Sequence, residues 1–264
     1  MSSLRDRGLS ALEDGWRSLD HEAQSTARVR ADHLRQSDVN VLVYGDERYP
    51  AAIASADSPP PFLYYIGNLD ILARRNVGMC GSREASARGL EAARTCGEEV
   101  AAHDFNVVSG YARGVDMETH LAALRSGGCT VIVLAEGISH FRVKRALKDL
   151  ADWNRMLVLS QFPPTQTWTA GAAMTRNGVI VGLAEALVVI EASERGGTLN
   201  AGERALKAGK PVVALQFSEG TPAGNRILFE AGASPLSRRT DLASYLDGLT
   251  EESVREGGQG SLLD

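Results

Sequence analysis

Short apolar runs alternate with longer segments of helical periodicity over most of the chain. Apolar runs typical of β-strands occur at 77–80, 105–108, 129–135, 156–160, 186–190 and 211–215. Segments of helical periodicity lie between them, at 86–102, 115–126, 141–151, 171–183 and 198–208. Runs such as Ala186 to Ile190 are continuously apolar, which is typical of strands buried on both faces. The alternation therefore predicts an α/β fold with a doubly wound, mostly parallel sheet.

The two ends of the chain depart from this alternation. At the N-terminus, apolar residues recur at helical spacing in a charged background, which predicts one or two amphipathic helices. Short strands are expected at 41–44 and 62–66. After Leu249 the sequence is polar and contains glycine, which is typical of a disordered tail. The expected organisation is a helical extension over 1–40, a main domain over 41–249 and a disordered tail over 250–264.

Composition limits which partners the protein can bind and the cell compartment in which it is expected. The 264 residues carry a formal net charge of -5, so binding to a nucleic acid would require a local cationic patch. The three cysteines, Cys80, Cys96 and Cys129, lack C-x-x-C spacing, and no secretory signal is present. Both features favour a reducing cytoplasm. No apolar segment approaches the ~20 residues that a membrane-spanning helix needs, so no membrane partner is expected.

Two turns from strand to helix combine glycine with arginine. The segment VGMCGSREAS at 77–86 and the segment SGYARGVDMETH at 109–120 supply the candidate residues Gly81, Ser82, Arg83, Ser109, Gly110, Arg113 and Gly114. At such turns, free backbone N–H groups and the helix dipole favour an anion, and arginine adds a forked cation. The carboxyl ends of parallel strands meet at one edge of a sheet, so the two loops together predict a phosphate-binding site. A simple glycine turn is the alternative interpretation of the first loop.

Two later segments extend the candidate site. Arg176 and Asn177 precede an apolar run, and they are either polar residues of a helix start or a third phosphate contact. Gly196, Gly197 and Thr198 open a helix after a strand, where they would offer free N–H groups and an N-cap hydroxyl.

A basic segment follows His140. Lys144, Arg145 and Lys148 are predicted to share one helical face, which is either ordinary solvated surface or a basic track that extends the site. Asp116 suits the first turn of a helix, and a structural role is favoured for it and for His120.

Several cofactor motifs are absent from the sequence. It contains no G-x-x-x-x-G-K-[ST], no G-x-G-x-x-G, no H-E-x-x-H and no clustered set of cysteine and histidine. We therefore expect no standard nucleotide cofactor and no metal site.

The ordered set of motifs resembles the DNA-processing protein A (DprA/Smf) family. The segments that carry the resemblance are GSR (81–83), SGYARGVD (109–116), GGCT (127–130), RNGVIVGLAEALVVIEA (176–192), GGTLNAGERALKAGKPV (196–212), AGN (223–225) and AGA (231–233). The resemblance spans about residues 45–235, and the order of the motifs makes it specific.

This resemblance implies an extended Rossmann-like domain that binds single-stranded DNA, has no catalytic residues, forms a homodimer and delivers the strand to a RecA-type recombinase. It implies DNA contacts at the Gly81–Arg83 loop, at Arg113 and at Arg176-Asn177, and a dimer interface within 211–233. The pathway stays open between DNA uptake, recombination and defence. The chain departs from the family pattern at His140-Phe141, at Gly178 and at Leu215–Phe217.

A nucleotide sensor or nucleotide-processing enzyme is the alternative. The related LOG family of nucleotide phosphoribohydrolases carries the loop P-G-G-x-G-T-x-x-E, and the nearest stretch here is Gly196–Ala201. Ala201 stands where the catalytic carboxylate belongs. Glu203 comes two residues later, and because a helix rotates ~100° per residue it points to another face. Hydrolysis is therefore disfavoured, whereas nucleotide sensing stays open. Phe141 and Trp168 are candidate stacking aromatics, with packed rings as the alternative interpretation.

Overall fold

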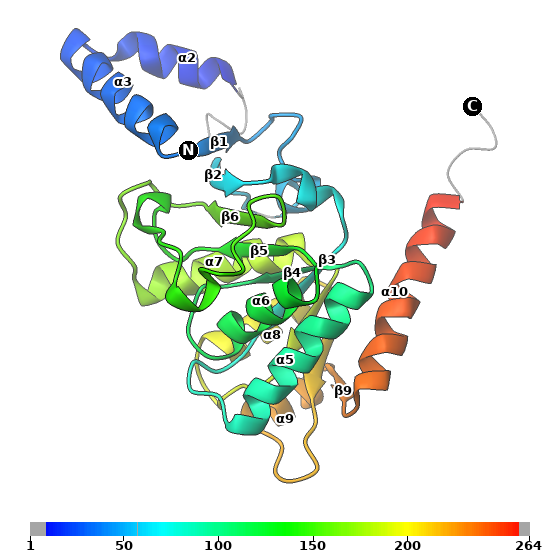
Figure 1. Cartoon of the computed structure of the whole chain (residues 1–264). Helices are drawn as coiled ribbons and strands as arrows, with labels where there is room; N and C mark the ends of the chain where they lie inside the picture. The colour runs from blue at the N-terminus through cyan, green and yellow to red at the C-terminus, as the bar shows by residue number, and fades with distance from the viewer. Residues whose placement is uncertain (1–8, 57, 259–264) are drawn as a thin grey trace.

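A computed structural model describes residues 9–56 and 58–258, which form one sheet between two layers of helices (Figure 1). The strands are β1 (Asn40–Val43), β2 (Phe62–Gly67), β3 (Asn76–Cys80), β4 (Asn106–Ser109), β5 (Thr130–Val133), β6 (Met156–Ser160), β7 (Ala186–Val189), β8 (Val212–Leu215) and β9 (Ser234–Leu236). Their order in the sheet is β1-β2-β6-β5-β4-β3-β7-β8-β9. The pairs β1–β2 and β2–β6 are antiparallel, and all other neighbours are parallel. The predicted doubly wound, mostly parallel sheet is confirmed.

Helices connect these strands and cover both faces of the sheet. The α-helices are α2 (Leu9–Ser18), α3 (His21–Gln36), α4 (Ala51–Ala54), α5 (Ala87–Ala102), α6 (Val115–Arg125), α7 (Ala170–Leu183), α8 (Gly197–Lys207), α9 (Ala223–Glu230) and α10 (Arg239–Gly258). Three short 3₁₀ helices are η1 (Leu69–Ala73), η2 (Ile138–His140) and η3 (Arg145–Leu147).

The chain reverses its direction of travel across the sheet next to β3. From β3 it adds β4, β5 and β6 on one side, and then it returns to place β7, β8 and β9 on the other side. The helix after β3, α5, and the helix after β7, α8, pack in different core clusters on the two faces. A crevice therefore opens between the two loops that leave β3 and β7. In doubly wound sheets, ligands bind at such a switch point.

Alternating residues of each buried strand supply the core on the two faces. In β7, Val188 packs in the cluster that contains α5, whereas Leu187 and Val189 pack in the cluster that contains α8. Each such side chain contributes about 1.5–3 kcal/mol when it is fully buried. The three cysteines are free and buried within this core. A sheet buried on both faces holds its carboxyl edge rigidly, so the loops at that edge are well positioned.

The predicted helix over 141–151 is wrong. This stretch is an irregular loop that contains only the turn of η3. Its apolar spacing has another cause, because Phe141 and Leu147 are buried in the cluster that includes Ile132 and Leu134. Two anchor residues in a loop produced a spacing that imitates a helix.

The predicted tail boundary at 249/250 is also wrong, because it falls inside a helix. The helix α10 continues to Gly258, so residues 250–258 are helical. Leu242 and Leu246 are buried against α5 and fix the start of α10. Glutamate and arginine in the polar part favour helix. The rest of the predicted tail, 259–264, lies outside the described residues.

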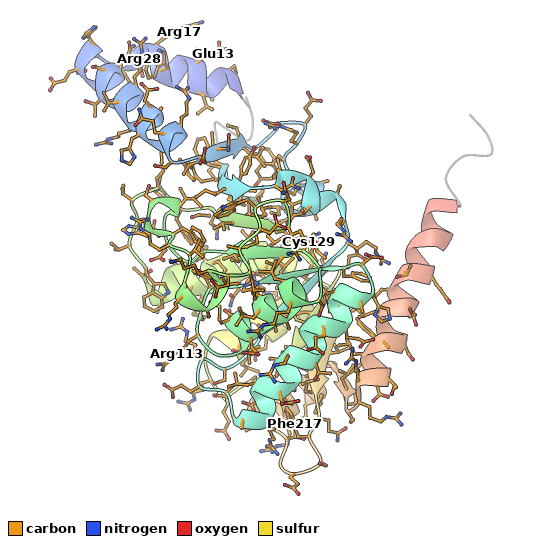
Figure 2. The ribbon with its side chains drawn as sticks, viewed as in Figure 1. Glu13, Arg17, Arg28, Arg113, Cys129 and Phe217 are labelled. Carbon is orange, nitrogen blue, oxygen red and sulfur yellow. The ribbon has the colours of Figure 1, made fainter. Side chains whose placement is uncertain are left out.

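The N-terminal region forms two helices, α2 and α3, which lie side by side and stand away from the sheet in Figure 1. The Gln24 side chain donates a hydrogen bond to the Trp16 carbonyl oxygen at 3.0 Å, and the Arg28 guanidinium lies 5.4 Å from the Trp16 ring centre. Figure 2 labels Glu13, Arg17 and Arg28 on this helical pair. Helix α3 has no buried residue. None of the helices in 9–56 and 58–258 has the length and hydropathy to cross a lipid bilayer.

Candidate functional site

Two adjoining cavities form one groove at the carboxyl edge of the parallel strands. We call the cavity of about 610 Å³ the inner cavity, and it is lined by the loops after β3, β4 and β7 and by one side of α7. We call the cavity of about 530 Å³ the outer cavity, and it is lined by the loops after β4 and β5. Both are lined by Arg83, Ala112, Arg113, Trp168 and Arg176. The groove therefore includes the switch point and continues from it toward η2.

The inner cavity collects most of the residues predicted from the sequence. Its lining includes Gly81, Ser82, Arg83, Gly110, Arg113, Arg176, Asn177, Gly196, Gly197 and Thr198. Ser109 and Gly114 do not line it. Ser109 is buried, and its hydroxyl donates to the Met79 carbonyl oxygen at 2.6 Å. Gly114 has φ of +79°, and a Cβ there would lie 2.4 Å from the Ser82 carbonyl oxygen. The prediction that these two residues contact a ligand is replaced by a role in shaping the loops.

The groove is locally cationic although the chain is acidic. Cationic side chains in the lining are Arg83, Arg113, Arg142, Lys144, Arg176 and Arg195, and carboxylates are Glu84, Asp116 and Glu136. Positive charge in a concave site attracts anions and concentrates the field there. The local patch that an acidic chain needs for binding a polyanion is present.

Arg113, which is labelled in Figure 2, lines both cavities of the groove. It forms an ion pair with Glu84. Their side chains are 71% and 79% exposed. An exposed pair of this kind is weak, because both charges stay solvated. Arg113 can therefore leave Glu84 for a phosphate at little cost in folding free energy.

Arg176 differs from Arg113 because it is buried in the middle of α7 and not at a helix start. Its Nη1 donates to the Val133 carbonyl oxygen at 2.7 Å, whereas its buried Nε has no hydrogen-bond partner among the described residues. Burial lowers the pKa of Arg176, and the nearby Asp116 carboxylate raises it. The phosphate contact predicted for Arg176 stays a prediction: one guanidinium nitrogen already bonds to the protein at the floor of the groove, and Nε is an unpaired donor among the described residues.

Asn177 is buried beside Arg176, and it also has a partner in the protein. Its side-chain nitrogen donates to the Gly197 carbonyl oxygen at 3.1 Å, which connects α7 to the first residue of α8. The phosphate contact predicted for Asn177 stays a prediction, and the observed bond positions the first residue of α8.

The N-terminus of α8 is open toward the groove. Gly196 caps this helix without a side-chain hydrogen bond, and its first turn has no acidic residue. A Cβ at Gly196 or at Gly197 would meet nothing within 4 Å, so space is open beside both. Free N–H groups at such a terminus attract an anion. The predicted N-cap role of Thr198 is wrong, since its hydroxyl donates to the Gly81 carbonyl oxygen at 3.0 Å and joins the loops after β3 and β7.

The N-terminus of α6 is less open, contrary to the sequence-based expectation. Asp116 and Glu118 stand in its first turn, and the Asp116 carboxylate accepts a hydrogen bond from the Ala112 backbone N–H at 3.3 Å. The backbone N–H of Val115 donates to the Ser82 carbonyl oxygen at 3.2 Å. The N–H group at the N-terminus of α6 thus binds the loop that carries Arg83, and the Asp116 carboxylate holds the loop that carries Arg113.

The predicted basic track lies on a loop and not on one helical face. Of its three residues only Lys144 lines the groove, and Arg145 and Lys148 lie outside both cavities. The Lys144 ammonium donates to the Tyr111 carbonyl oxygen, lies 4.1 Å from the Tyr111 ring centre and has a pKa lowered by burial. The predicted track of three basic residues is therefore wrong, and of the three only Lys144 lies in the groove.

Sequence reasoning missed Arg142 and Arg195 as groove residues. Arg195 directly precedes Gly196, so its place beside a glycine loop was a usable signal. Arg142 has no such signal, because the apolar spacing of 141–151 predicts a helix there. Of the two candidate aromatics, Phe141 is buried and packs on Tyr111 and Trp153, whereas Trp168 is 47% exposed and lines both cavities. The Arg83 guanidinium lies 5.3 Å from the Trp168 ring centre.

The residues at the LOG-like position lie outside the lining of the groove. Ala201 is buried in α8, and Glu203 is exposed and lines neither cavity. The carboxylate that a LOG-type loop directs at its ligand is therefore not in the groove.

Comparison with known proteins identifies the family. The family model of DNA recombination-mediator protein A matches residues 40–247. DNA processing protein DprA from Streptococcus pneumoniae is 34% identical over 206 residues, which cover 76% of this chain and 72% of that protein. The same-named protein from Bacillus subtilis is 30% identical over 217 residues, which cover 80% of this chain and 73% of that protein.

Solved structures agree with the sequence matches. The crystal structure of the Streptococcus pneumoniae protein superposes with a TM-score of 0.71 at 30% identity, covering 86% of this chain and 83% of that chain. DNA processing protein A from Helicobacter pylori, whose structure concerns a single-stranded DNA binding mode, has a TM-score of 0.70 at 21% identity, covering 81% and 96%. The chain belongs to the DNA recombination-mediator protein A (DprA/Smf) family.

Proposed function

We propose that this protein binds single-stranded DNA along the groove formed by the inner and outer cavities. The observation that carries the proposal is the groove itself, which places six cationic side chains and the open N-terminus of α8 along one concave surface. A strand contacts such a surface mainly through consecutive phosphates. Family membership supports this reading, because the related Helicobacter pylori protein is described with a single-stranded DNA binding mode.

Each part of the groove has a role in this proposal. Arg83 and Arg113 pair with phosphates as forked donors, and the N–H groups of the Gly196–Thr198 turn bind another phosphate. Arg176 and Asn177 act underneath, where they hold the loops in place. Binding is non-catalytic in this proposal, which the position of Glu203 outside the groove supports.

The proposal includes a preference for single strands over duplex. The groove is built mainly from loops, and the lining that the described residues form includes no exposed basic helix that would enter a major groove. A single strand can bend into the inner cavity and separate its bases, whereas a duplex has a fixed diameter and paired bases. We therefore expect tighter binding to a single strand.

The partners of this protein also belong to the proposal. We propose a homodimer and a RecA-type recombinase as the next carrier of the strand, and the family name supports the second. The apolar residues of 211–233 do not support a dimer interface there, because Val212–Leu215 and Leu228 are buried in the protein's own core. Light scattering at micromolar concentration tests the dimer, and a monomer there would contradict it. A cytoplasmic location is proposed from the unpaired cysteines.

A salt titration tests the DNA proposal. Anisotropy of a labelled single-stranded oligonucleotide, the matching duplex and a labelled mononucleotide would be measured between 50 and 200 mM salt. We expect the single strand to bind most tightly, with a linear decrease of log affinity with log salt. Equal affinity for duplex and single strand would contradict the proposal. Tight binding of the mononucleotide alone would instead favour the nucleotide sensor.

A further inference from the structure

The N-terminal helical pair presents apolar side chains that it does not bury. Leu12, Trp16 and Leu19 follow one another at spacings of four and three residues, so they lie on one side of α2 and of the residue after it. We call these three residues the α2 face. They line an open concavity of about 640 Å³ whose lining lies entirely within residues 11–19. No described side chain of α2 or α3 is buried, and an apolar helical stripe is stable only when another element covers it.

The neighbouring helix α3 touches only the margin of this face, through polar groups. The Gln24 side chain donates to the carbonyl oxygens of Trp16 and Leu19 at 3.0 and 3.2 Å, and the Arg28 guanidinium lies over the Trp16 ring. None of the residues of α3 lines the concavity, and Leu19 is 41% exposed. The α2 face is therefore open on the side away from α3.

This face is separate from the DNA groove and from the shared family domain. The family model begins at residue 40, whereas α2 and α3 lie within residues 9–36. Neither cavity of the groove is lined by a residue of these two helices. A partner bound to the α2 face would consequently leave the lining of the groove unoccupied.

The charges beside the α2 face distinguish between the possible partners. Glu13 and Arg17 flank it on one side and form an ion pair with atoms 3.6 Å apart. Their side chains are 69% and 74% exposed, so the pair is weak and can exchange partners. A face that binds a nucleic acid or an anionic lipid surface is flanked mainly by basic residues. One acidic and one basic residue, four positions apart, instead complement a second copy of the same helix.

An antiparallel pair of α2 helices satisfies the apolar and the charged groups together. When Leu12 packs opposite the partner's Trp16, two-fold symmetry repeats the same contact at the other end of the seam. In this register Arg17 lies about 3 Å along the helix axis from the partner's Glu13, on the same side of the seam. A parallel pair would place Glu13 and Arg17 on opposite sides of the seam from those of the partner, so the charges select the antiparallel order.

We propose that the α2 face is the surface on which a second copy of this chain docks, with the two α2 helices antiparallel. This inference rests on the homodimer of the proposed function and gives that dimer an interface outside the DNA-binding domain. Because the groove takes no part in this contact, each copy in the dimer retains a complete groove.

The first test compares the same substitution at two exposed apolar residues of the full-length chain. Leu19→Glu places a carboxylate on the α2 face, whereas Val29→Glu is the matched control on α3, where Val29 is 66% exposed. Sedimentation equilibrium without DNA measures the dissociation constant of the dimer. We expect Leu19→Glu to raise this constant by roughly tenfold or more, because an unpaired charge would be buried at the seam. Val29→Glu should match the parent.

A charge exchange tests the antiparallel order. Glu13→Arg and Arg17→Glu each place like charges across the seam, so each variant alone should dimerise more weakly than the parent. In an equimolar mixture the basic flank of one variant faces the acidic flank of the other. Heterodimers should therefore form with an affinity close to that of the parent. A mixture that dimerises as weakly as its components would overturn the antiparallel pairing.

The outcomes separate this inference from the proposed function. A parent that is monomeric at micromolar concentration would overturn the homodimer and the α2 face together. A parental dimer that Leu19→Glu leaves intact, or that Val29→Glu weakens equally, would overturn the α2 face alone. Leu19→Glu should still bind a short single-stranded oligonucleotide as the parent does. Failure of the parent to bind that oligonucleotide would overturn the DNA proposal and leave the dimer standing.

Cross-linking gives a second measurement that does not depend on a tight dimer. A Cβ at Gly15 would meet nothing within 4 Å, and the antiparallel register brings the two Gly15 positions within one helical turn of each other. Gly15→Cys should form covalent dimers with a short bis-maleimide, because the chain's own cysteines are buried. Val29→Cys should form few. Equal yields from the two variants would indicate random collision and would overturn the proposal.

Discussion

The Nε2 atom of His120 lies 2.6 Å from the carbonyl oxygen of Gly110, in the interior beneath the groove. The other ring nitrogen, Nδ1, lies 2.6 Å from the Thr130 hydroxyl. Burial lowers the pKa of His120 to about 4, against a smaller raising effect from the Gly110 carbonyl and Asp116. The neutral ring thus donates Nε2–H to the Gly110 carbonyl oxygen, and the Thr130 hydroxyl proton faces two acceptors, His120 Nδ1 and the Val107 carbonyl oxygen at 3.0 Å. The bond to Gly110 ties the loop that carries Arg113 to α6.

We expect the free energy of unfolding to depend on pH through His120. An unfolded histidine titrates near 6.5, so the unfolded chain binds more protons than the folded chain as the pH falls below that value. The stability is fully present above pH 6.5 and is lost progressively toward pH 4, by up to about 3 kcal/mol. The Asp116 carboxylate also raises the pKa of this ring, whereas Arg176 and Lys144 lower it.

Urea unfolding at several pH values between 4.5 and 7.5 measures this effect. In His120→Gln the amide can still donate to Gly110 but does not titrate, so its unfolding free energy should fall less steeply toward acid than that of the parent. The exposed His21, changed to Gln, is the control and should follow the parent. Parallel curves for His120→Gln and the parent would show that His120 does not contribute.

In the proposed binding mode Glu84 would compete with a DNA phosphate for Arg113, which predicts opposite effects for two substitutions. Arg113→Ala should weaken binding of a single strand by about 1.5–3 kcal/mol, because one charge-assisted phosphate contact is lost. Glu84→Gln should strengthen binding, because it frees Arg113 and removes a repelling carboxylate. Anisotropy across a salt series measures both, and the slope should fall by about one phosphate contact for Arg113→Ala.

Arg113→Lys should recover only part of the affinity, since lysine retains the charge but lacks the fork. The thermal midpoint should be unchanged in all three variants, because both side chains are exposed. A large drop in the midpoint of Arg113→Ala would make Arg113 a structural clamp. Parent-like binding by that variant would place the DNA elsewhere.

Hydrophobic pattern predicted the sheet well because the strands are buried on both faces. The runs at 77–80 and 186–190 correspond to β3 and β7 within one or two residues. The pattern was misleading for 141–151, because Phe141 and Leu147 anchor an irregular loop rather than one face of a helix. The spacing of apolar residues alone cannot distinguish an amphipathic helix from an irregular loop with buried anchor residues, since both place apolar side chains in the core.

The sequence predicted where the candidate site lies, but not which of its side chains are free to contact a ligand. Glycine and arginine at strand ends identified the loops, because parallel strands end at one edge. The sequence does not show which donors are already used inside the protein. Arg176 bonds to Val133 and Thr198 bonds to Gly81, and both contacts depend on how the loops meet. Trp168 became informative only through its exposure in the groove.

Arg176 and Arg113 should respond differently to the same substitution. Arg176→Met retains most of the stem but removes the donor to the Val133 carbonyl oxygen, so the free energy of unfolding should fall by about 1–3 kcal/mol. Arg113→Met changes an exposed side chain and should leave that free energy unchanged. Urea denaturation of the two variants measures the contrast. Equal stability of both variants would show that Arg176 does not brace the groove.

The glycines that open α8 offer the sharpest test of the anion site. Gly197→Ala places a methyl group in open space, and alanine favours helix, so the unfolding free energy should be unchanged or rise by up to about 1 kcal/mol. The same methyl group would occupy the space that a phosphate needs beside the free N–H groups. Affinity for a single-stranded oligonucleotide should therefore fall, by roughly tenfold or more, in a fully folded protein.

Gly114→Ala is the contrasting variant, because its φ of +79° and the Ser82 oxygen 2.4 Å from a Cβ predict a destabilised fold. Circular dichroism and anisotropy on the two variants separate fold from binding. If Gly197→Ala binds the strand as tightly as the parent does, the N-terminus of α8 does not hold a phosphate, and the arginines of the loops after β3 and β4 must bind the backbone without it.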